Sequence, residues 1–235
     1  MRALFLALSV FLPSSANALP ESPTPASSAE ARKPAAVILD PGHGGEDLGA
    51  VVHGRREKDI ALAIARKVKD KLEKLGAKPT LTRDSDIFIP LDKRVTEFQE
   101  GEAFVSLHLN QVRSKRLQGI TVYAFGKNRF KSKSRPHKHK VAPLPEPPQD
   151  EARASNDLAL SIVRSLRAQG FRVDPPAKAA FYVLKNPSVP SVLIELGYMS
   201  HPQEGARLLD PAYQDRLAEA VAVSLQSYFL AFAKL

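Results

Sequence analysis

The stretch Val37-Ile-Leu-Asp-Pro-Gly-His-Gly-Gly45 opens the ordered part of this sequence. Its three apolar residues are typical of a buried strand, and Pro41 ends that strand because proline lacks a backbone donor and fixes φ. The glycines around His43 allow a sharp turn and a close approach to a bound group. His43 is therefore predicted at the carboxyl end of a strand, where open α/β sheets bind their ligands.

Strand-like and helix-like segments alternate from Ala35 onward. Strands are predicted over Ala35–Asp40, Lys78–Arg83, Ala103–Leu109, Gly119–Phe125, Phe181–Lys185 and Ser191–Gly197. Helices are predicted over Glu57–Gly76, Pro90–Glu100, Ser155–Gly170, Pro202–Leu209 and Pro211–Phe232, with Ser155 or Asn156 as the N-cap of the third. This order predicts an α/β three-layer sandwich, with a mostly parallel twisted sheet of about six strands and helices on both faces.

The composition limits the chemistry that the chain can perform. None of its 235 residues is a cysteine, so a metal site must use His, Asp and Glu. The formal net charge is +9, which favours polyanionic partners such as nucleic acid, anionic lipid or a carboxylate-bearing polymer.

The first residues resemble a secretory signal. Met1-Arg2 is basic, Ala3–Leu12 is apolar, and Pro13–Ala18 ends in a small-x-small site, so cleavage is predicted near Ala18. The apolar run is shorter than the roughly 20 residues that span a membrane. We expect a signal peptide over 1–18, a flexible Pro/Ser/Ala-rich linker over 19–34 and a folded domain over 35–235. A periplasmic or secreted protein without a stable membrane anchor follows, which argues against a nucleic-acid partner.

Polar residues interrupt the apolar strands at their carboxyl ends. His43 follows the first strand, His108 lies near the end of the third, and Glu195 sits within an apolar run. These ends meet at one edge of a parallel sheet, and Glu57 joins them if its helix begins over that edge. Two imidazoles with one or two carboxylates favour a zinc site with an open fourth position.

Each of these residues also has a simpler interpretation. His43 could fill a turn, and His108 could be a hydrogen-bonded core histidine. Glu57 could be favoured in a first helical turn by the helix dipole alone. Glu195 is harder to explain structurally, since an unpaired buried carboxylate costs several kcal/mol. The combination is more informative than any single residue.

These motifs resemble the catalytic domain of the zinc-dependent N-acetylmuramoyl-L-alanine amidases, the amidase_3 family. The resemblance runs in order from about Ala35 to the end of the chain. The matching pieces are Leu39-Asp-Pro-Gly-His-Gly-Gly45 with Gly49-Ala50, Glu57-Lys-Asp59 with Ala61–Ala65, Leu81-Thr-Arg-Asp84 with Leu91 and Arg94, Val105-Ser-Leu-His-Leu-Asn110, and Pro190-Ser-Val-Leu-Ile-Glu-Leu-Gly-Tyr-Met-Ser200.

The resemblance implies a role for each matching residue. His43, Glu57 and His108 would bind one zinc ion, and Glu195 would be the catalytic carboxylate. The substrate would be peptidoglycan, cut between N-acetylmuramic acid and L-alanine of the stem peptide. Because histidine ligands need orienting partners, Asp40, Asn110 and Arg94 are expected to supply them. The sequence departs from the family pattern at Leu109, which replaces Ala, and over Tyr198–His201, but no ligand is lost.

The segment Lys127–Asp150 interrupts the alternation with a basic half and a Pro-rich half. In Gram-negative relatives the corresponding region carries a helix that blocks the zinc site until an activator protein displaces it. Its composition here is poor helix material, so we expect a mobile loop that binds the wall or an activator, and not a plug. A solvated linker without a role is the alternative.

Two other functions compete with amidase activity. A non-catalytic peptidoglycan-binding module could keep the fold, although it would not need Glu195 as a general base. Another exported zinc hydrolase, a peptidase or an esterase, could use the same residues.

Overall fold

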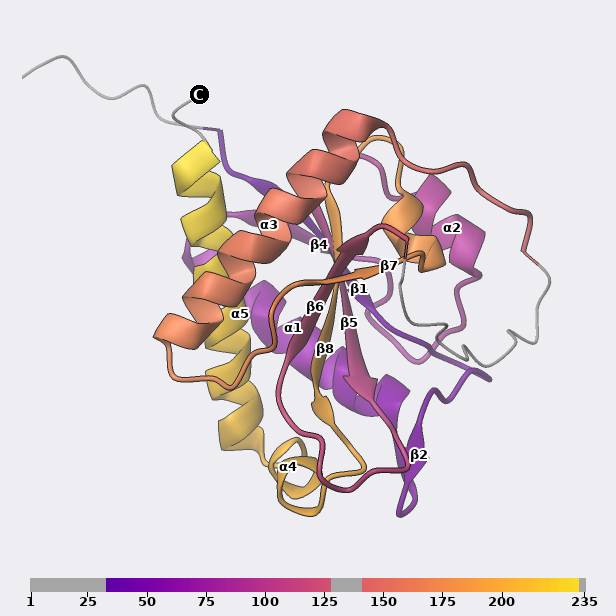
Figure 1. The fold of residues 1–235 in the computed structure, drawn as a ribbon, viewed down its shortest axis with the longest axis vertical. Coiled ribbons are helices and arrows are strands. Elements are labelled where there is room, and N and C mark those ends of the chain that lie inside the picture. Colours follow the sequence, from indigo (N-terminus) through magenta and orange to yellow (C-terminus); the bar gives the residue numbers. More distant parts are fainter. Residues whose placement is uncertain (1–32, 128–140, 233–235) are drawn as a thin grey trace, which may run out of the picture. The chain divides into compact units, whose positions relative to one another are not determined.

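Six strands form one mixed sheet in the computed structural model, which describes residues 33–127 and 141–232 (Figure 1). Their order across the sheet is β4 (Lys78–Leu81), β1 (Ala36–Pro41), β5 (Ala103–Asn110), β8 (Ser191–Tyr198), β6 (Thr121–Phe125) and β7 (Ala177–Ala179). Only the β6–β8 pair is antiparallel among these neighbours. The predicted, mostly parallel sheet is confirmed.

The predicted signal peptide, residues 19–32 of the predicted linker and residues 128–140 of the predicted insertion lie outside the described residues. The elements below all belong to the unit Pro34–Leu235. Within the described ranges, no helix combines the length and the apolar character needed to cross a membrane.

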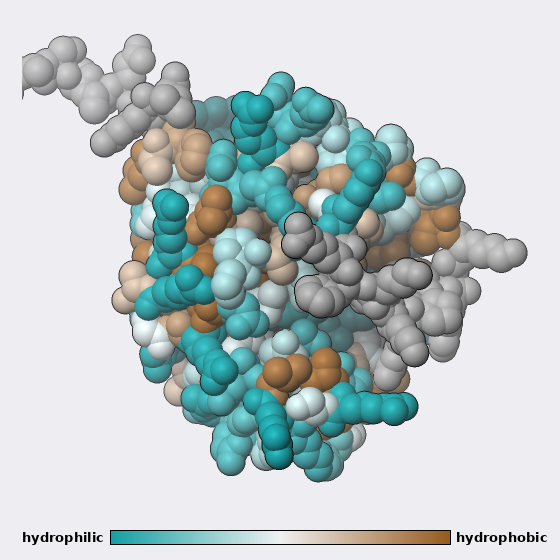
Figure 2. All heavy atoms as spheres, viewed as in Figure 1, coloured by the Kyte–Doolittle hydropathy of each residue, from teal (hydrophilic) through white to brown (hydrophobic). Residues whose placement is uncertain are grey.

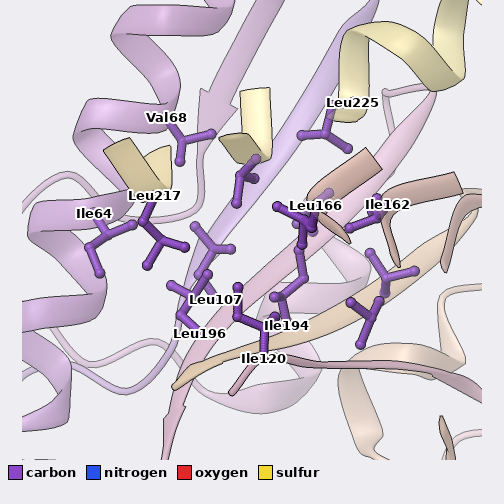
Figure 3. Close-up of a cluster of buried hydrophobic side chains, with 14 of the residues drawn as sticks. Ile64, Val68, Leu107, Ile120, Ile162, Leu166, Ile194, Leu196, Leu217 and Leu225 are labelled. Atoms are coloured by element: carbon purple, nitrogen blue, oxygen red, sulfur yellow. The ribbon is translucent and has the colours of Figure 1, made fainter. Parts of the chain in front are cut away.

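Three long helices cover one face of the sheet: α1 (Glu57–Lys74), α3 (Gln149–Ala168) and α5 (Pro211–Phe232) (Figure 1). Strand side chains alternate between faces, so that Val37 and Leu39 of β1 point toward these helices and Ile38 points away. Figure 3 shows apolar side chains from the three helices meeting those of the central strands. This layer contains the main hydrophobic core.

The opposite face carries much less structure. It holds α2 (Leu91–Thr96) and the 3₁₀ helix η1 (Tyr182–Lys185), which pack over a smaller core that includes Ile38, Phe104 and Leu193. The prediction of helices on both faces is confirmed, but the two layers are unequal. The thin layer leaves room at the carboxyl ends of β1, β5 and β8.

One predicted strand is wrong. Phe181–Lys185 was expected to be a strand, but Tyr182–Lys185 forms η1, and the edge strand is β7 instead. Val183 and Leu184 are adjacent and both buried, so the apolar pattern of this short run does not show whether it forms a strand or a helix. β7 has the sequence Ala-Lys-Ala and pairs only with β6, so it lacks the apolar pattern of a central strand.

The predicted N-cap of α3 is also wrong, because the helix begins at Gln149, after Pro148. Ser155 lies one and a half turns inside the helix, where its buried hydroxyl donates to the Glu151 carbonyl at 2.7 Å. The same oxygen accepts the Ser191 N–H of β8 at 2.8 Å. Ser155, a residue type that often caps helices, therefore connects α3 to β8.

The surface shown in Figure 2 is mixed. Hydrophilic side chains project around the described part of the chain, and apolar residues appear between them in separate groups. The same alternation occurs along α3, where Leu166 is fully buried and Leu160 is 40% exposed.

These two leucines provide a test of the main core. We expect Leu166→Ala to lower the free energy of unfolding by about 2–5 kcal/mol, because it leaves a cavity between α3 and the sheet. Leu160→Ala on the same helix should change it by less than about 0.5 kcal/mol. Urea denaturation of both variants measures the difference, and equal losses would contradict this packing.

Candidate metal centre and active-site cavity

The loop after β1 presents His43 in a left-handed conformation, with φ of 62°. Two buried arginines hold its backbone. Arg83 donates to the carbonyls of Pro41 at 3.0 Å and Gly42 at 2.7 Å. Arg94 donates to those of Pro41 at 2.9 Å and His43 at 2.6 Å. The guanidinium groups therefore fix the strained turn that aims the imidazole.

A short hairpin brings Glu57 to the same edge. β2 (Val51–Val52) and β3 (Arg55–Arg56) are joined by His53-Gly54, both with positive φ, as a two-residue hairpin turn requires. α1 starts directly after β3, so Glu57 is its first residue. Its carboxylate accepts the N–H of Ala50 at 2.8 Å and of Leu109 at 2.9 Å. The predicted elements do not include this hairpin.

His108 completes the cluster from β5. Glu57 bridges the two histidines, with Oε2 3.1 Å from His43 Nε2 and Oε1 3.0 Å from His108 Nδ1. One ligand atom from each residue lies within 4.8 Å of the others. The structure thus brings together the three residues that the resemblance implied as metal ligands.

Two glycines allow this close packing. A Cβ on Gly42 would lie 2.3 Å from the His108 ring, and one on Gly49 would lie 2.6 Å from the His43 ring. Gly49 also has a φ of +67°, which L side chains rarely adopt. The glycines therefore make room for the imidazoles themselves.

The carboxylates make this cluster strongly attractive for positive charge. Burial alone would lower the pKa of His43, but hydrogen bonds to Asp47 and Glu57 raise it to about 9. The pKa of Glu57 falls well below its usual value, because both imidazoles outweigh the opposing effect of burial. The Asp47 and Glu57 carboxylates, which favour a proton on His43, would also favour a bound cation.

Asp47 is a partner of His43 that the sequence analysis missed. Its carboxylate lies 2.8 Å from His43 Nδ1, on the side of the ring opposite Glu57. Burial opposes ionisation, but the contact with His43 lowers the pKa of Asp47 to about 2. A carboxylate at this nitrogen fixes the ring orientation and leaves Nε2 for a metal. The only feature of the sequence that could have indicated this contact is the spacing of four residues between His43 and Asp47.

Glu195 faces the cluster from the neighbouring strand. It pairs in register with His108 across β5 and β8. Its Oε2 atom is buried, and no described residue hydrogen-bonds to it. Burial, and then the charge of Glu57, raise the pKa of Glu195 to about 8, although His43 opposes this. A carboxylate oxygen that is buried without a partner beside a metal-type cluster is what a catalytic base would show.

The expected orienting residues occupy different places. Asp40 accepts hydrogen bonds from Arg94 at 2.6 Å, Thr82 at 2.7 Å and Ser106 at 2.6 Å. Burial would raise its pKa, but Arg94 and the two hydroxyls hold the pKa of Asp40 below its usual value. Asp40 therefore acts on His43 through Arg94, which binds the loop backbone.

Asn110 has a different position from the other two. It lines the cavity beside the cluster, and its carbonyl accepts the Met199 N–H at 2.9 Å. An orienting role for its side chain stays a prediction.

A cavity of about 730 Å³ opens above these residues. Its lining includes His43, Glu57, His108 and Glu195, and the polar residues Asn110 and Gln111. Many of its other lining residues are apolar, among them Phe88, Leu91, Val141, Ala142, Phe181 and Leu193. The cluster is therefore open to a ligand much larger than water.

Comparison with known proteins gives a consistent result. The family model described as N-acetylmuramoyl-L-alanine amidase, Amidase_3, matches residues 37–227. The chain is 32% identical to the N-acetylmuramoyl-L-alanine amidase AmiC of Escherichia coli over 222 residues, which are 84% of this chain and 53% of AmiC. It therefore spans about half the length of that relative.

Solved structures agree with the sequence comparison. An N-acetylmuramoyl-L-alanine amidase from Clostridium difficile 630 superimposes with a TM-score of 0.69 at 27% identity, covering 84% of this chain and 97% of that one. The CwlD amidase of Clostridioides difficile, solved in complex with the GerS lipoprotein, gives a TM-score of 0.63 at 26% identity and covers 84% and 99%. The motifs, the fold and these matches together show that the chain belongs to the N-acetylmuramoyl-L-alanine amidase family, Amidase_3.

Proposed function

We propose that this protein is an exported zinc hydrolase that cuts the amide bond between N-acetylmuramic acid and L-alanine in peptidoglycan. The observation that carries the proposal is the buried Oε2 atom of Glu195, which has no hydrogen-bond partner among the described residues, beside the His43–Glu57–His108 cluster. We infer the bond that is cut, and peptidoglycan as the polymer that contains it, from membership of the Amidase_3 family. The size of the cavity, about 730 Å³, suits a glycopeptide segment.

The donor set fits zinc. Two imidazole nitrogens and one carboxylate oxygen are typical ligands of a catalytic zinc, which keeps a further position open. The Glu57 carboxylate, held by two backbone N–H groups, and His43, held by Asp47, are already oriented toward a common point. When bound, the ion would polarise the scissile carbonyl and lower the pKa of a coordinated water towards about 7.

The protein's own groups would handle the proton. Glu195 takes a proton from the attacking water, and the oxygen of that water bonds to the lactyl carbonyl carbon. As the carbon–nitrogen bond breaks, Glu195 returns the proton to the leaving nitrogen of L-alanine. The products are a lactyl carboxylate and a free amine, so no further reactant is needed. Burial and the charge of Glu57 raise the pKa of Glu195 without the ion, and a bound dication would lower it, so that the carboxylate can accept the proton.

Export and an activator protein stay predictions. The basic, Pro-rich segment over 127–150 is where we expect an activator to act. CwlD, a relative solved in complex with the GerS lipoprotein, gives a precedent for a protein partner on this fold. Deletion of Phe130–Pro148 should not raise basal activity many-fold, since we expect no plug there.

Metal content tests the ligand assignment. His43→Ala and His108→Ala should each lose bound zinc after dialysis, because the remaining two ligands cannot hold the ion tightly. His53→Ala, in the hairpin turn and outside the cluster, is the matched control and should keep it. Elemental analysis gives zinc per chain, and full occupancy in either cluster variant would refute the assignment.

The geometry of the loop gives a second test of the cluster. Gly49→Ala should weaken zinc binding at least about tenfold, since its Cβ would displace His43 and Glu57. Gly54→Ala is the matched control. Gly54 also has a positive φ, of +77°, but a Cβ added there would meet nothing within 4 Å. This variant should lose stability without losing zinc affinity. Chelator competition distinguishes the two variants.

The role of Glu195 can be separated from metal binding. Glu195→Gln should lower turnover by a factor of about 10²–10⁴ while zinc stays bound, because an amide cannot accept the proton. Turnover is measured as the release of free stem peptides with an N-terminal L-alanine from purified peptidoglycan. Loss of zinc from this variant would recast Glu195 as a ligand.

The same substrate assay decides between the proposed function and its rivals. Wild-type protein with zinc should release the peptides and leave the glycan strands uncut. Binding without release would indicate a non-catalytic module. Cleavage within the peptide would indicate a peptidase.

A further inference from the structure

The segment Val141–Pro148, which precedes α3, forms part of the cavity wall. Its first two residues, Val141 and Ala142, line the cavity. Four of its eight residues are prolines, which have no backbone N–H. Such a segment can accept hydrogen bonds at its carbonyls but can donate few. Any firm attachment must therefore come from donors elsewhere in the chain.

The helix η1 supplies two such donors. Tyr182 Oη donates to the Ala142 carbonyl at 2.9 Å, and Lys185 Nζ donates to the Leu144 carbonyl at 3.0 Å. Tyr182 and Lys185 are three residues apart, so their side chains lie on the same side of a 3₁₀ helix. Together they fasten Val141–Leu144, which we call the strap, along the cavity.

The fastened strap completes an apolar wall. Beside Val141 and Ala142 lie the rings of Phe181 and Tyr182 and the side chain of Leu193. Phe181 is itself supported from behind by Tyr123, with ring centroids 5.3 Å apart. One acidic group, Asp92, also lines this side of the cavity. After burial, the charge of Asp92 contributes to the raised pKa of Tyr182, which places the two close together.

The loop between β5 and β6 instead carries positive charge. Asn110, the last residue of β5, and Gln111 line the cavity and lead into this loop (Figure 1). Arg113, Lys115 and Arg116 in this loop are exposed. Within the described part of the chain, none of these three cations has an ion-pair partner.

We propose that the strap and the apolar side chains beside it, which we call the strap wall, bind the uncharged glycan side of the substrate. Tyr182 and Lys185 hold the strap in place. The stem peptide then extends out of the cavity along the β5–β6 loop. This inference rests on the proposed function and assigns an orientation to the substrate in that same site. Tyr182 and Lys185 are then positioning residues, which act through the strap.

Desolvation and the charge of Asp92 favour this orientation over its reverse, and the cation that holds the strap, Lys185, already donates to the Leu144 carbonyl. A stem peptide carries carboxylates, which would lose hydration against the apolar wall and be repelled by Asp92. The exposed cations of the β5–β6 loop attract the same carboxylates. A pyranose ring instead presents C–H groups on its faces and hydroxyl donors at its edge, which suit an aromatic ring beside a carboxylate.

The strap is well suited to hold a fixed wall. Proline restricts the unbound backbone to extended conformations, so little further entropy is lost when a ligand packs against it. Without the two side-chain donors, the same backbone has no other described attachment near the cavity. Removing them should therefore weaken contacts on the glycan side only.

The double variant Tyr182→Phe/Lys185→Met tests this, since it removes both donors and keeps the ring and the alkyl stem. In a Glu195→Ala background with zinc present, we would titrate an uncharged N-acetylglucosamine oligosaccharide and free stem peptide separately. The affinity for the glycan should fall about five- to tenfold, and that for the peptide should change less than about twofold. In the active protein, KM for peptidoglycan should rise by a similar factor with kcat nearly unchanged.

A matched control is Tyr213→Phe/Lys69→Met, on α5 and α1 behind the sheet, which should leave both affinities unchanged. Unchanged glycan affinity in the strap variant would overturn the inference, as would equal weakening of both probes. If the double variant is less stable, Tyr182→Phe alone should still shift glycan binding in the same direction. Because binding needs no turnover, failure of the wild type to cut peptidoglycan would count against the proposed function alone.

Discussion

The buried ion pair between Asp40 and Arg94, 2.6 Å apart, is the contact on which the site depends. Asp40 ends β1 and also accepts hydroxyls from Thr82 and Ser106, so the carboxylate is fully satisfied. Arg94 uses its remaining donors on the carbonyls of the loop that carries His43. Removing one partner of such a pair typically costs about 3–5 kcal/mol, because the other charge stays buried. The metal-type cluster is thus built on a loop whose backbone is fixed from below by charge.

The unequal layers of the sandwich explain why this edge can act as a site. Three long helices bury one face of the sheet, while the short α2 and η1 cover only part of the other. The carboxyl ends of β1, β5 and β8 therefore stay accessible on the thin side. His43, His108 and Glu195 come from these three strands, and the hairpin before α1 adds Glu57. A stable core on one face supports the cavity at the edge of the other.

Polarity within the cavity links the chemistry to the substrate. Acidic groups around His43 favour a cation, and the Glu195 carboxylate lies in the same cavity. The strap wall is mostly apolar, and the β5–β6 loop is basic. The proposed substrate has a similar division, with neutral sugars on one side of the scissile amide and an acidic peptide on the other. The proposed orientation matches these two divisions.

The sequence by itself determined the alternation of elements, the four candidate residues of the site and their family, because strand ends, glycine turns and an acid within an apolar run are local features. It did not determine η1 or the start of α3, because the burial of Val183 and Leu184 and the contact of Ser155 with β8 override local preference. The hairpin before Glu57 consists of two strands of two residues each, which are too short to show a pattern. Nor did it identify Asp47 as the partner of His43 or the roles of Arg83, Tyr182 and Lys185. Those roles consist of contacts with backbone carbonyls and side chains that only the folded chain brings within hydrogen-bonding distance.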